Sequence, residues 1–105
     1  MSRYLLSPAA QIDLDEIWDY TAARWGTDQA ERYVRTLLAA CEALADKRLA
    51  GRPIDHVRPG YFKFAVASHF ICYRFTPTGL LDVVRVLHGR MDLDERLTGR
   101  SRDDE

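Results

Sequence analysis

The chain has only two cysteines and three histidines, and none of its apolar runs approaches the length of a membrane span. A helix that crosses a bilayer needs about 20 mainly apolar residues, so we expect no transmembrane segment. The N-terminus has no basic stretch followed by an apolar core, which predicts no secretion signal and a cytoplasmic location. Cys41 and Cys72 stand in apolar surroundings without metal-ligand spacing. They are predicted to be buried, reduced thiols, with no metal or cofactor site.

An excess of either charge is also missing from the chain as a whole. With 15 basic and 16 acidic residues and a pI near 6.3, bulk attraction gives no support for direct DNA binding. The distribution is less even, because residues 51–90 carry six basic and two acidic side chains while both flanking segments are acidic. Thirteen of the 15 cations are arginines, which suit paired or planar contacts. The basic stretch is either an ordinary surface or a binding patch.

The first half of the chain has the periodicity of two helices. A short apolar run at Tyr4–Leu6 predicts an edge strand, and Ser7 followed by Pro8 is typical of a helix start. The predicted buried stripe of the first helix is Ala10, Leu14, Ile17, Trp18, Thr21 and Trp25, and the predicted solvated face holds Asp13, Asp15, Glu16 and Asp19. Gly26 is the expected C-terminal cap.

A second helix is predicted to begin at Thr27-Asp28, after a turn of only a few residues. Its apolar stripe comprises Ala30, Tyr33, Val34, Leu37, Leu38, Cys41, Leu44 and Ala45. So short a connection requires the two helices to lie antiparallel, as a helical hairpin with one buried side on each helix. The break at residues 51–53 ends the helical part.

The second half of the chain predicts three strands joined by short turns. Alternation and β-branched content indicate strands at Tyr61–Ala67, Phe70–Phe75 and Leu80–His88, with the last as the central strand. Links this short produce an antiparallel meander. A further helical turn is expected at Asp92–Leu97, within a single domain spanning residues 3–97, and residues 98–105 are expected to form a mobile tail. The predicted fold is therefore α+β, with a helical hairpin packed on a small antiparallel sheet.

Both faces of this sheet are predicted to be apolar. The first strand of the meander alternates Phe62, Phe64 and Val66 with Tyr61, Ala65 and Ala67, and its neighbour is apolar on both sides as well. Two helices cover one face only. A large apolar patch left in water usually marks an interaction site, so we expect a partner, the tail or a second copy to cover the other face.

Several motifs give the chain a family resemblance. They are Tyr-Leu-Leu-Ser-Pro-Ala-Ala at residues 4–10, Asp-Leu-Asp-Glu-Ile-Trp-Asp-Tyr at 13–20, Arg-Pro-Gly-Tyr at 58–61, Tyr-Arg at 73–74 and Val-Leu-His-Gly-Arg-Met-Asp at 86–92. The last of these is the most specific. Over about residues 3–97 the sequence resembles the ParE toxins of the RelE/ParE superfamily, which belong to bacterial type II toxin–antitoxin modules.

This resemblance implies a non-enzymatic toxin that inhibits DNA gyrase by stabilising its cleaved DNA complex. It also implies neutralisation by a ParD-like antitoxin, whose C-terminal segment folds onto the toxin in a hetero-oligomer. The expected gyrase contacts are Arg58, Tyr61, Arg85, His88, Arg90, Met91 and Asp92, with the first two beside the end of the last strand. The expected antitoxin contacts are Trp18, Trp25, Phe62, Phe64 and Phe70.

The same superfamily contains RelE-like enzymes that cut mRNA on the ribosome, which gives an alternative function. Such chemistry needs cations around the phosphate and a proton-transfer pair. The resemblance puts Phe62, Phe64 and Phe70 at the positions where those enzymes carry lysines and an arginine. The neighbouring cations are Lys63, Arg74, Arg85, His88 and Arg90. Strict alternation sends Arg85 and His88 to opposite faces of the strand, which disfavours a joint site.

Other chemistry has less support in the sequence. There is no glycine-rich phosphate loop, no nucleophile elbow and no cysteine–histidine cluster. His56, His69 and His88 are widely separated, and each is expected to pack or hydrogen-bond singly. We therefore assign no catalytic residue, and an inactive interaction domain remains a third possibility.

Overall fold

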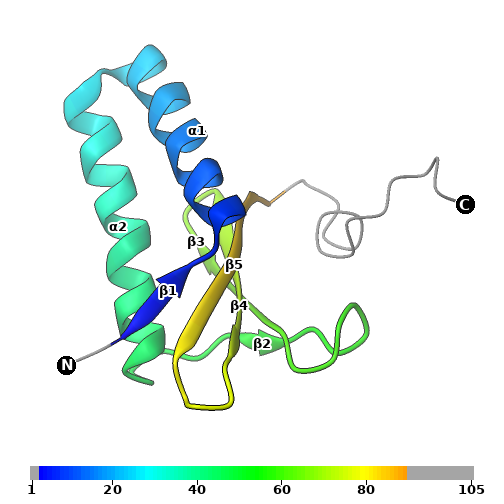
Figure 1. Ribbon diagram of the computed structural model, residues 1–105. Helices are drawn as coiled ribbons and strands as arrows, with labels where there is room; N and C mark the ends of the chain where they lie inside the picture. Colours follow the sequence, from blue (N-terminus) through cyan, green and yellow to red (C-terminus); the bar gives the residue numbers. More distant parts are fainter. Residues whose placement is uncertain (1–2, 90–105) are drawn as a thin grey trace, which may run out of the picture.

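The computed structural model describes residues 3–89, which form a helical hairpin packed on one face of a five-stranded sheet (Figure 1). None of the helices in this part of the chain is both long enough and apolar enough to cross a membrane. The elements in chain order are β1 Tyr4–Leu6, α1 Pro8–Trp25, α2 Thr27–Ala45, β2 Arg52–Pro53, β3 Phe62–Val66, β4 His69–Phe75 and β5 Leu81–His88.

The helical hairpin forms as the sequence predicts. The hydroxyl oxygen of Ser7 accepts the Ala10 N–H at 3.0 Å, and Pro8 occupies the first turn, where a missing N–H costs no hydrogen bond. Gly26 alone separates the two helices. Its φ of 96° and ψ of 164° give it the positive φ expected of a C-cap, but an extended ψ in place of the left-handed helical value. One residue in this conformation turns the chain back on itself.

The sheet has the order β1-β5-β4-β3-β2, and it is mixed, not wholly antiparallel. The three long strands form the expected antiparallel meander, but β1 pairs in parallel with β5. The middle position belongs to β4, so the prediction that Leu80–His88 is central was wrong by one strand. β4 is the better centre because its residues 70–73 are buried on both faces.

The main core lies between the hairpin and the sheet. It combines Leu14 and Ile17 of α1, Leu37 and Leu44 of α2, and the strand residues Ile71, Tyr73, Leu81, Val83 and Val86. Each large apolar side chain removed from water here contributes about 1.5–3 kcal/mol. Phe62, Phe64 and Val66 point to this same side and are partly buried against it.

The other face of the sheet is covered in part by the chain itself. Ile54, in the loop after β2, is buried against Cys72 of β4, with Val57, Tyr61 and Val84 around the pair. The expectation that a partner, the tail or a second copy covers the second face was therefore wrong in this region. Sequence reasoning missed the cover because residues 54–61 have no periodic pattern, although they fold back over the strand they precede.

Two local details also differ from the expectation. The β3–β4 turn is Ala67-Ser68, since Val66 pairs with His69, and Ala67 takes a φ of 53°. The break at residues 51–53 contains the short strand β2, and Gly51, just before it, lies against β3. A Cβ on Gly51 would collide with the Lys63 carbonyl oxygen, so only glycine fits there. The helical turn predicted at Asp92–Leu97 and the tail at 98–105 lie outside the described residues.

Candidate functional site

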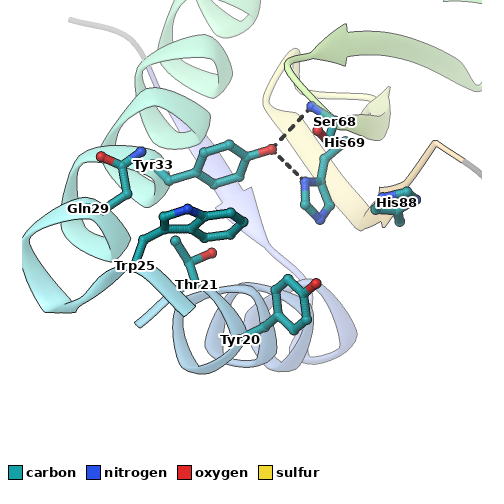
Figure 2. Close-up of a pocket in the computed structure, with 8 residues that line it drawn as sticks. All are labelled: Tyr20, Thr21, Trp25, Gln29, Tyr33, Ser68, His69 and His88. Atoms are coloured by element: carbon teal, nitrogen blue, oxygen red, sulfur yellow. Dashed lines mark hydrogen bonds between the residues drawn. The ribbon is translucent and has the colours of Figure 1, made fainter. Parts of the chain in front are cut away.

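An open pocket of about 330 Å³ lies where the tip of the helical hairpin passes the end of the sheet (Figure 2). Aromatic and imidazole rings form most of its wall. Its lining residues are Tyr20, Thr21 and Trp25 of α1, Gln29 and Tyr33 of α2, Ser68 and His69 at the β3–β4 turn, and His88 of β5. Elements from both halves of the chain thus meet at one site.

Tyr33 ties the second helix to the β3–β4 turn at this pocket. Its hydroxyl oxygen accepts the Ser68 N–H at 3.2 Å and lies 2.7 Å from Nδ1 of His69 (Figure 2). The direction of the second bond depends on the tautomer of His69: the tyrosine donates its proton to a bare Nδ1, whereas a protonated Nδ1 donates to the tyrosine oxygen. Burial lowers the pKa of His69, and the charge of His88 lowers it further while Asp13 acts in the opposite direction.

His69 and His88 are direct cross-strand neighbours, with ring centroids 5.4 Å apart. The expectation that the histidines pack singly was wrong for this pair. Near the β4–β5 turn Phe75 pairs with Leu81. If each residue of β4 faced one residue of β5 from there on, Leu87 would lie opposite His69. A bulge in β5 adds one residue between the pairs at Tyr73 and Cys72, and this brings His88 opposite His69. Counting residues from the β4–β5 turn could predict that His69 and His88 lie close together. It could not predict the bulge that places them directly opposite each other.

A second cavity of about 290 Å³ continues the pocket along α1. It shares Tyr20, Thr21, His69 and His88 with the first and adds Asp13, Glu16, Ile17 and Val86. The two cavities therefore form one groove between α1 and the end of β5. We call this surface the hairpin groove.

Asp13 is buried at the inner end of the hairpin groove, with 7% of its surface exposed. Its carboxylate accepts two hydrogen bonds from Arg85, at 2.8 and 2.9 Å, and a third from the Val86 N–H at 3.0 Å. The hydrogen bond to Asp13 is the main reason that the pKa of Arg85 is raised. The prediction that Asp13 lies on the solvated face of the helix was wrong. Arg85 is held in a structural ion pair.

The outer end of the hairpin groove is aromatic and exposed. Tyr20 and Trp25 have 61% and 62% of their surface accessible, and the Arg24 guanidinium lies over both rings at 5.5 and 5.2 Å from the centroids. Trp25 was predicted as part of the buried stripe of α1, but it extends past the sheet, and the other described residues leave most of it exposed. Trp18 is half-buried.

The three phenylalanines expected to contact an antitoxin lie on both sides of the sheet. Phe62 stacks on Tyr73 with centroids 5.3 Å apart, and Phe64 packs against the main core. Phe70 is 7% exposed, and Lys63 Nζ lies 5.4 Å from its ring centroid. They do not form one continuous patch. Phe62 and Phe64 retain some exposure at the β3 side of the helix-covered face.

The residues expected to contact gyrase are not all together. Arg58 lies over the ring of Tyr61 at 5.5 Å, in the loop that covers Cys72, near the start of β3. His88 lies level with the other end of β3, because it pairs with His69, which pairs with Val66. The expectation that these two groups lie side by side was wrong. Arg90, Met91 and Asp92 lie outside the described residues.

The buried thiols and the described acidic and imidazole side chains offer no metal centre. Within residues 3–89, no group of three or more histidine, cysteine, aspartate or glutamate side chains is placed to hold an ion. Burial raises the pKa of both Cys41 and Cys72 to about 12. Neither thiol is therefore a thiolate nucleophile or ligand at neutral pH.

Comparison with known proteins gives a consistent result. Residues 4–93 match the family described as the ParE toxin of the type II toxin–antitoxin system, parDE. Toxin ParE1 of Mycobacterium tuberculosis is 56% identical over 91% of this chain and 98% of its own length. Toxin ParE1 of Caulobacter vibrioides is 40% identical over 88% and 94%, and Toxin ParE of Escherichia coli is 32% identical over 95% and 97%.

A solved structure described as the chromosomal ParDE TA system from P. aeruginosa has the same fold. It superposes with a TM-score of 0.71 at 21% identity and covers 84% of this chain and 96% of its own. The α+β architecture and the sequence matches lead to the same assignment. The chain therefore belongs to the ParE toxin family of type II toxin–antitoxin systems.

Proposed function

We propose that this ParE family member inhibits DNA gyrase by stabilising its cleaved DNA complex, without being an enzyme itself, and that a ParD-like antitoxin neutralises it. The observation that carries the proposal is the match to ParE toxins over residues 4–93, with relatives covered almost to their full length. We also propose that the protein acts in the cytoplasm, where gyrase is found. The family's parDE system supports a ParD counterpart.

The environment of the sheet cations supports action by binding rather than by RNA cleavage. Arg74 is paired with Asp82 at 3.1 Å, and Arg85 is paired with Asp13. An arginine held in such a pair contributes less to the charge stabilisation that a phosphoryl transition state requires. The RelE-like positions hold the rings of Phe62, Phe64 and Phe70, which carry no charge that could stabilise such a transition state.

Two surfaces are candidates for the gyrase contact. His88 ends β5 and leads directly into residues 90–92, which carry the rest of the most specific motif. Arg58 and Tyr61 form a separate group on the outer side of the sheet. We propose that the segment at 88–92 makes the main contact, since Arg58 and Tyr61 lie too far along β3 to act together with His88.

A plasmid assay tests the gyrase proposal. Folded toxin should inhibit supercoiling by purified gyrase and should trap linear, cleaved plasmid. Arg90→Ala should raise the inhibitory concentration about tenfold or more, as expected for a residue at the centre of an interface. Arg35→Ala is the matched control, because Arg35 is exposed on α2 and pairs with Glu31. Normal supercoiling with no trapped cleavage, at excess folded toxin, would refute the proposal.

The ribonuclease alternative has one observation in its favour, the adjacent imidazoles of His69 and His88. It predicts transcripts cut in the ribosomal A site when the toxin is expressed, and loss of cutting in His88→Ala. Primer extension on translated mRNA measures this directly. Intact transcripts together with trapped gyrase cleavage would exclude the alternative, and absence of both effects would favour an inactive interaction domain.

For the antitoxin we propose docking on the exposed part of α1, with Trp25 as the main contact and Trp18 beside it. Trp25 is a large exposed ring, the kind of residue that dominates interfaces. Phe62 and Phe64 are weaker candidates because they are half-buried. Co-expression with a ParD-like protein should increase soluble yield and remove gyrase inhibition. A toxin whose activity is unchanged by a bound ParD-like partner would refute neutralisation.

The extent of the working domain is a further part of the proposal. The family match ends at residue 93, and we propose that residues 98–105 are dispensable. A chain that ends at residue 97 should retain gyrase inhibition and antitoxin binding. Loss of inhibition in a folded truncation would extend the functional domain to the C-terminus.

A further inference from the structure

Two cations face each other across the pair of strands β2 and β3. Arg52 of β2 and Lys63 of β3 are directly opposite in the register, so both side chains project from the same face of the sheet. Like charges in this arrangement repel each other. Within residues 3–89, neither Arg52 nor Lys63 has an ion-pair partner. The fold therefore keeps two positive charges together without a carboxylate of the described chain to compensate them.

A cavity of about 460 Å³ opens beside these two cations. We call it the basic pocket, and the polar, aromatic and terminal residues of its wall are Arg52, Lys63, Ser68, His69, Phe70 and Gly89. The rest of the wall is glycine, alanine and one further phenylalanine. An anion that enters the basic pocket therefore meets two cations and none of the acidic side chains of residues 3–89.

Lys63 is held in place at this pocket without losing its charge. Its Nζ lies 5.4 Å from the ring centroid of Phe70, which is 7% exposed. A ring attracts an ammonium group but carries no net negative charge, so the ammonium stays positive and keeps its N–H donors. The hydroxyl of Ser68, in the same wall, is one more donor. These groups match the oxygens of a phosphate.

The basic pocket adjoins the segment proposed as the main gyrase contact. Gly89 forms part of the pocket wall and follows His88 directly. The Gly89 N–H donates to the Ser68 carbonyl oxygen at 3.0 Å, and this bond ties the start of the segment to the β3–β4 turn. A toxin that engages gyrase through residues 88–92 therefore carries the basic pocket into a complex that also contains DNA.

We infer that the basic pocket binds a phosphodiester group of the DNA that gyrase holds, with Arg52 and Lys63 as the two cations on the phosphate. The inference rests on the proposed gyrase function and adds DNA as a direct partner. The near-neutral charge of the whole chain does not oppose such a contact, because salt confines electrostatic attraction to about 10 Å at about 0.1 M. The unevenly distributed charge of residues 51–90 thus becomes a local binding patch.

The first test needs no gyrase. The full chain is titrated with a short DNA duplex, and its amide signals are followed by NMR. The signals of Arg52, Lys63 and Ser68 should shift, while the indole signal of Trp25, in the hairpin groove, should remain in place. Two duplexes of unrelated sequence should bind equally, because phosphate contacts carry no sequence information. Shifts confined to other surfaces, or no binding at low salt, would overturn the inference.

Paired variants locate the phosphate site. Arg52→Gln and Lys63→Gln should each weaken DNA binding about eightfold at about 0.1 M salt, the factor that one released counterion contributes. Arg48→Gln is the matched control, because Arg48 is an exposed arginine that pairs with Asp46 and does not line the basic pocket. It should bind DNA as the unchanged chain does. Equal losses in the three variants would indicate general attraction and would overturn a defined site.

A charge reversal separates binding from folding. Arg52→Glu should abolish DNA binding, yet its urea midpoint of unfolding should not fall, because the introduced carboxylate faces Lys63 and replaces repulsion with attraction. A lower midpoint together with lost binding would mean that Arg52 is structural, and it would overturn the inference.

Other anions test the identity of the occupant. Single-stranded RNA and a glutamate-rich peptide, each matched to the duplex in charge, should both bind more weakly than the duplex. A peptide that binds as tightly as DNA would show that the pocket does not select phosphate. RNA that binds more tightly than DNA would favour an RNA partner. Either result would overturn a DNA site.

The plasmid assay with purified gyrase separates this inference from the proposed function. Arg52→Gln should raise the inhibitory concentration about eightfold at about 0.1 M salt, and Arg48→Gln should leave it unchanged. If the unchanged toxin inhibits gyrase and Arg52→Gln inhibits it equally well, the inference fails and the proposed function stands. If folded toxin binds the duplex through Arg52 and Lys63 but leaves gyrase unaffected, the proposed function fails and the DNA phosphate site stands.

Discussion

The two halves of α1 differ sharply in their surroundings. In the N-terminal half, Asp13 is buried and its carboxylate accepts three hydrogen bonds from Arg85 and Val86. In the C-terminal half, Tyr20 and Trp25 are more than half exposed. One helix therefore holds the fold together at one end and presents unprotected aromatic surface at the other.

The geometry of the sheet explains the difference. β1 pairs with β5 only as far as the pair Leu6 and Val83, so the Val86 N–H has no strand partner on that side. An unpaired backbone N–H at a buried edge is costly, and Asp13 supplies the missing acceptor. Farther along, β5 ends at His88 while α1 continues to Trp25. The hairpin tip therefore extends past the sheet, where nothing in the described chain covers it (Figure 1).

The largest expected effect concerns the N-terminal half of α1, where Asp13 is buried. Asp13→Ala leaves the half-buried Arg85 and the Val86 N–H without their acceptor, and we expect a loss of about 3 kcal/mol in the free energy of unfolding. Urea denaturation measures it. Asp19→Ala, at an exposed position of the same helix, should change stability by less than about 0.5 kcal/mol. Equal losses in the free energy of unfolding would contradict a special structural role for Asp13 in the N-terminal half of α1.

The next largest effect concerns the C-terminal half of α1, where Trp25 is exposed. Trp25→Ala should reduce affinity for a ParD-like antitoxin about 30-fold, the loss typical of an aromatic hot spot, and should change the free energy of unfolding by less than about 0.5 kcal/mol. Calorimetric titration and urea denaturation separate the two quantities. Ile12→Ala removes a similarly exposed side chain outside the groove and should affect neither. A large stability loss in Trp25→Ala would mean that this end of the helix is structural too.

The smallest expected effect concerns His69 of β4, which lines the hairpin groove beside the middle of α1. Because folding lowers its pKa from 6.5, the unfolded chain binds more protons in the interval below that value. The contribution of His69 to stability is therefore complete above pH 6.5 and decreases as the pH falls toward the folded-state pKa. His69→Gln should flatten this part of the stability profile, and His56→Gln, at an exposed loop position, should not. Profiles that respond equally to both variants would rule out His69 as the titrating group.

Much of the fold could be predicted from the sequence because its signals are local. Ser7 and Pro8 mark the helix start, Gly26 marks the turn, and alternating residues mark the three long strands. The candidate site was harder to predict. Trp25 has the spacing of the buried stripe but is exposed. Asp13 has the spacing of the solvated face but is buried. Helical periodicity gives the direction of a side chain, but not where the neighbouring sheet begins and ends.

The sequence by itself determined the helical hairpin, the meander and the family, since caps, turn residues, periodicity and motifs are properties of neighbouring residues. Only the tertiary structure decided which charges are buried and which rings are exposed. The bulge in β5 sets His88 opposite His69, and the early end of β1 gives Asp13 its partners. Both depend on how strands far apart in the chain are paired, and a shift of one residue in that pairing exchanges the two faces of a strand.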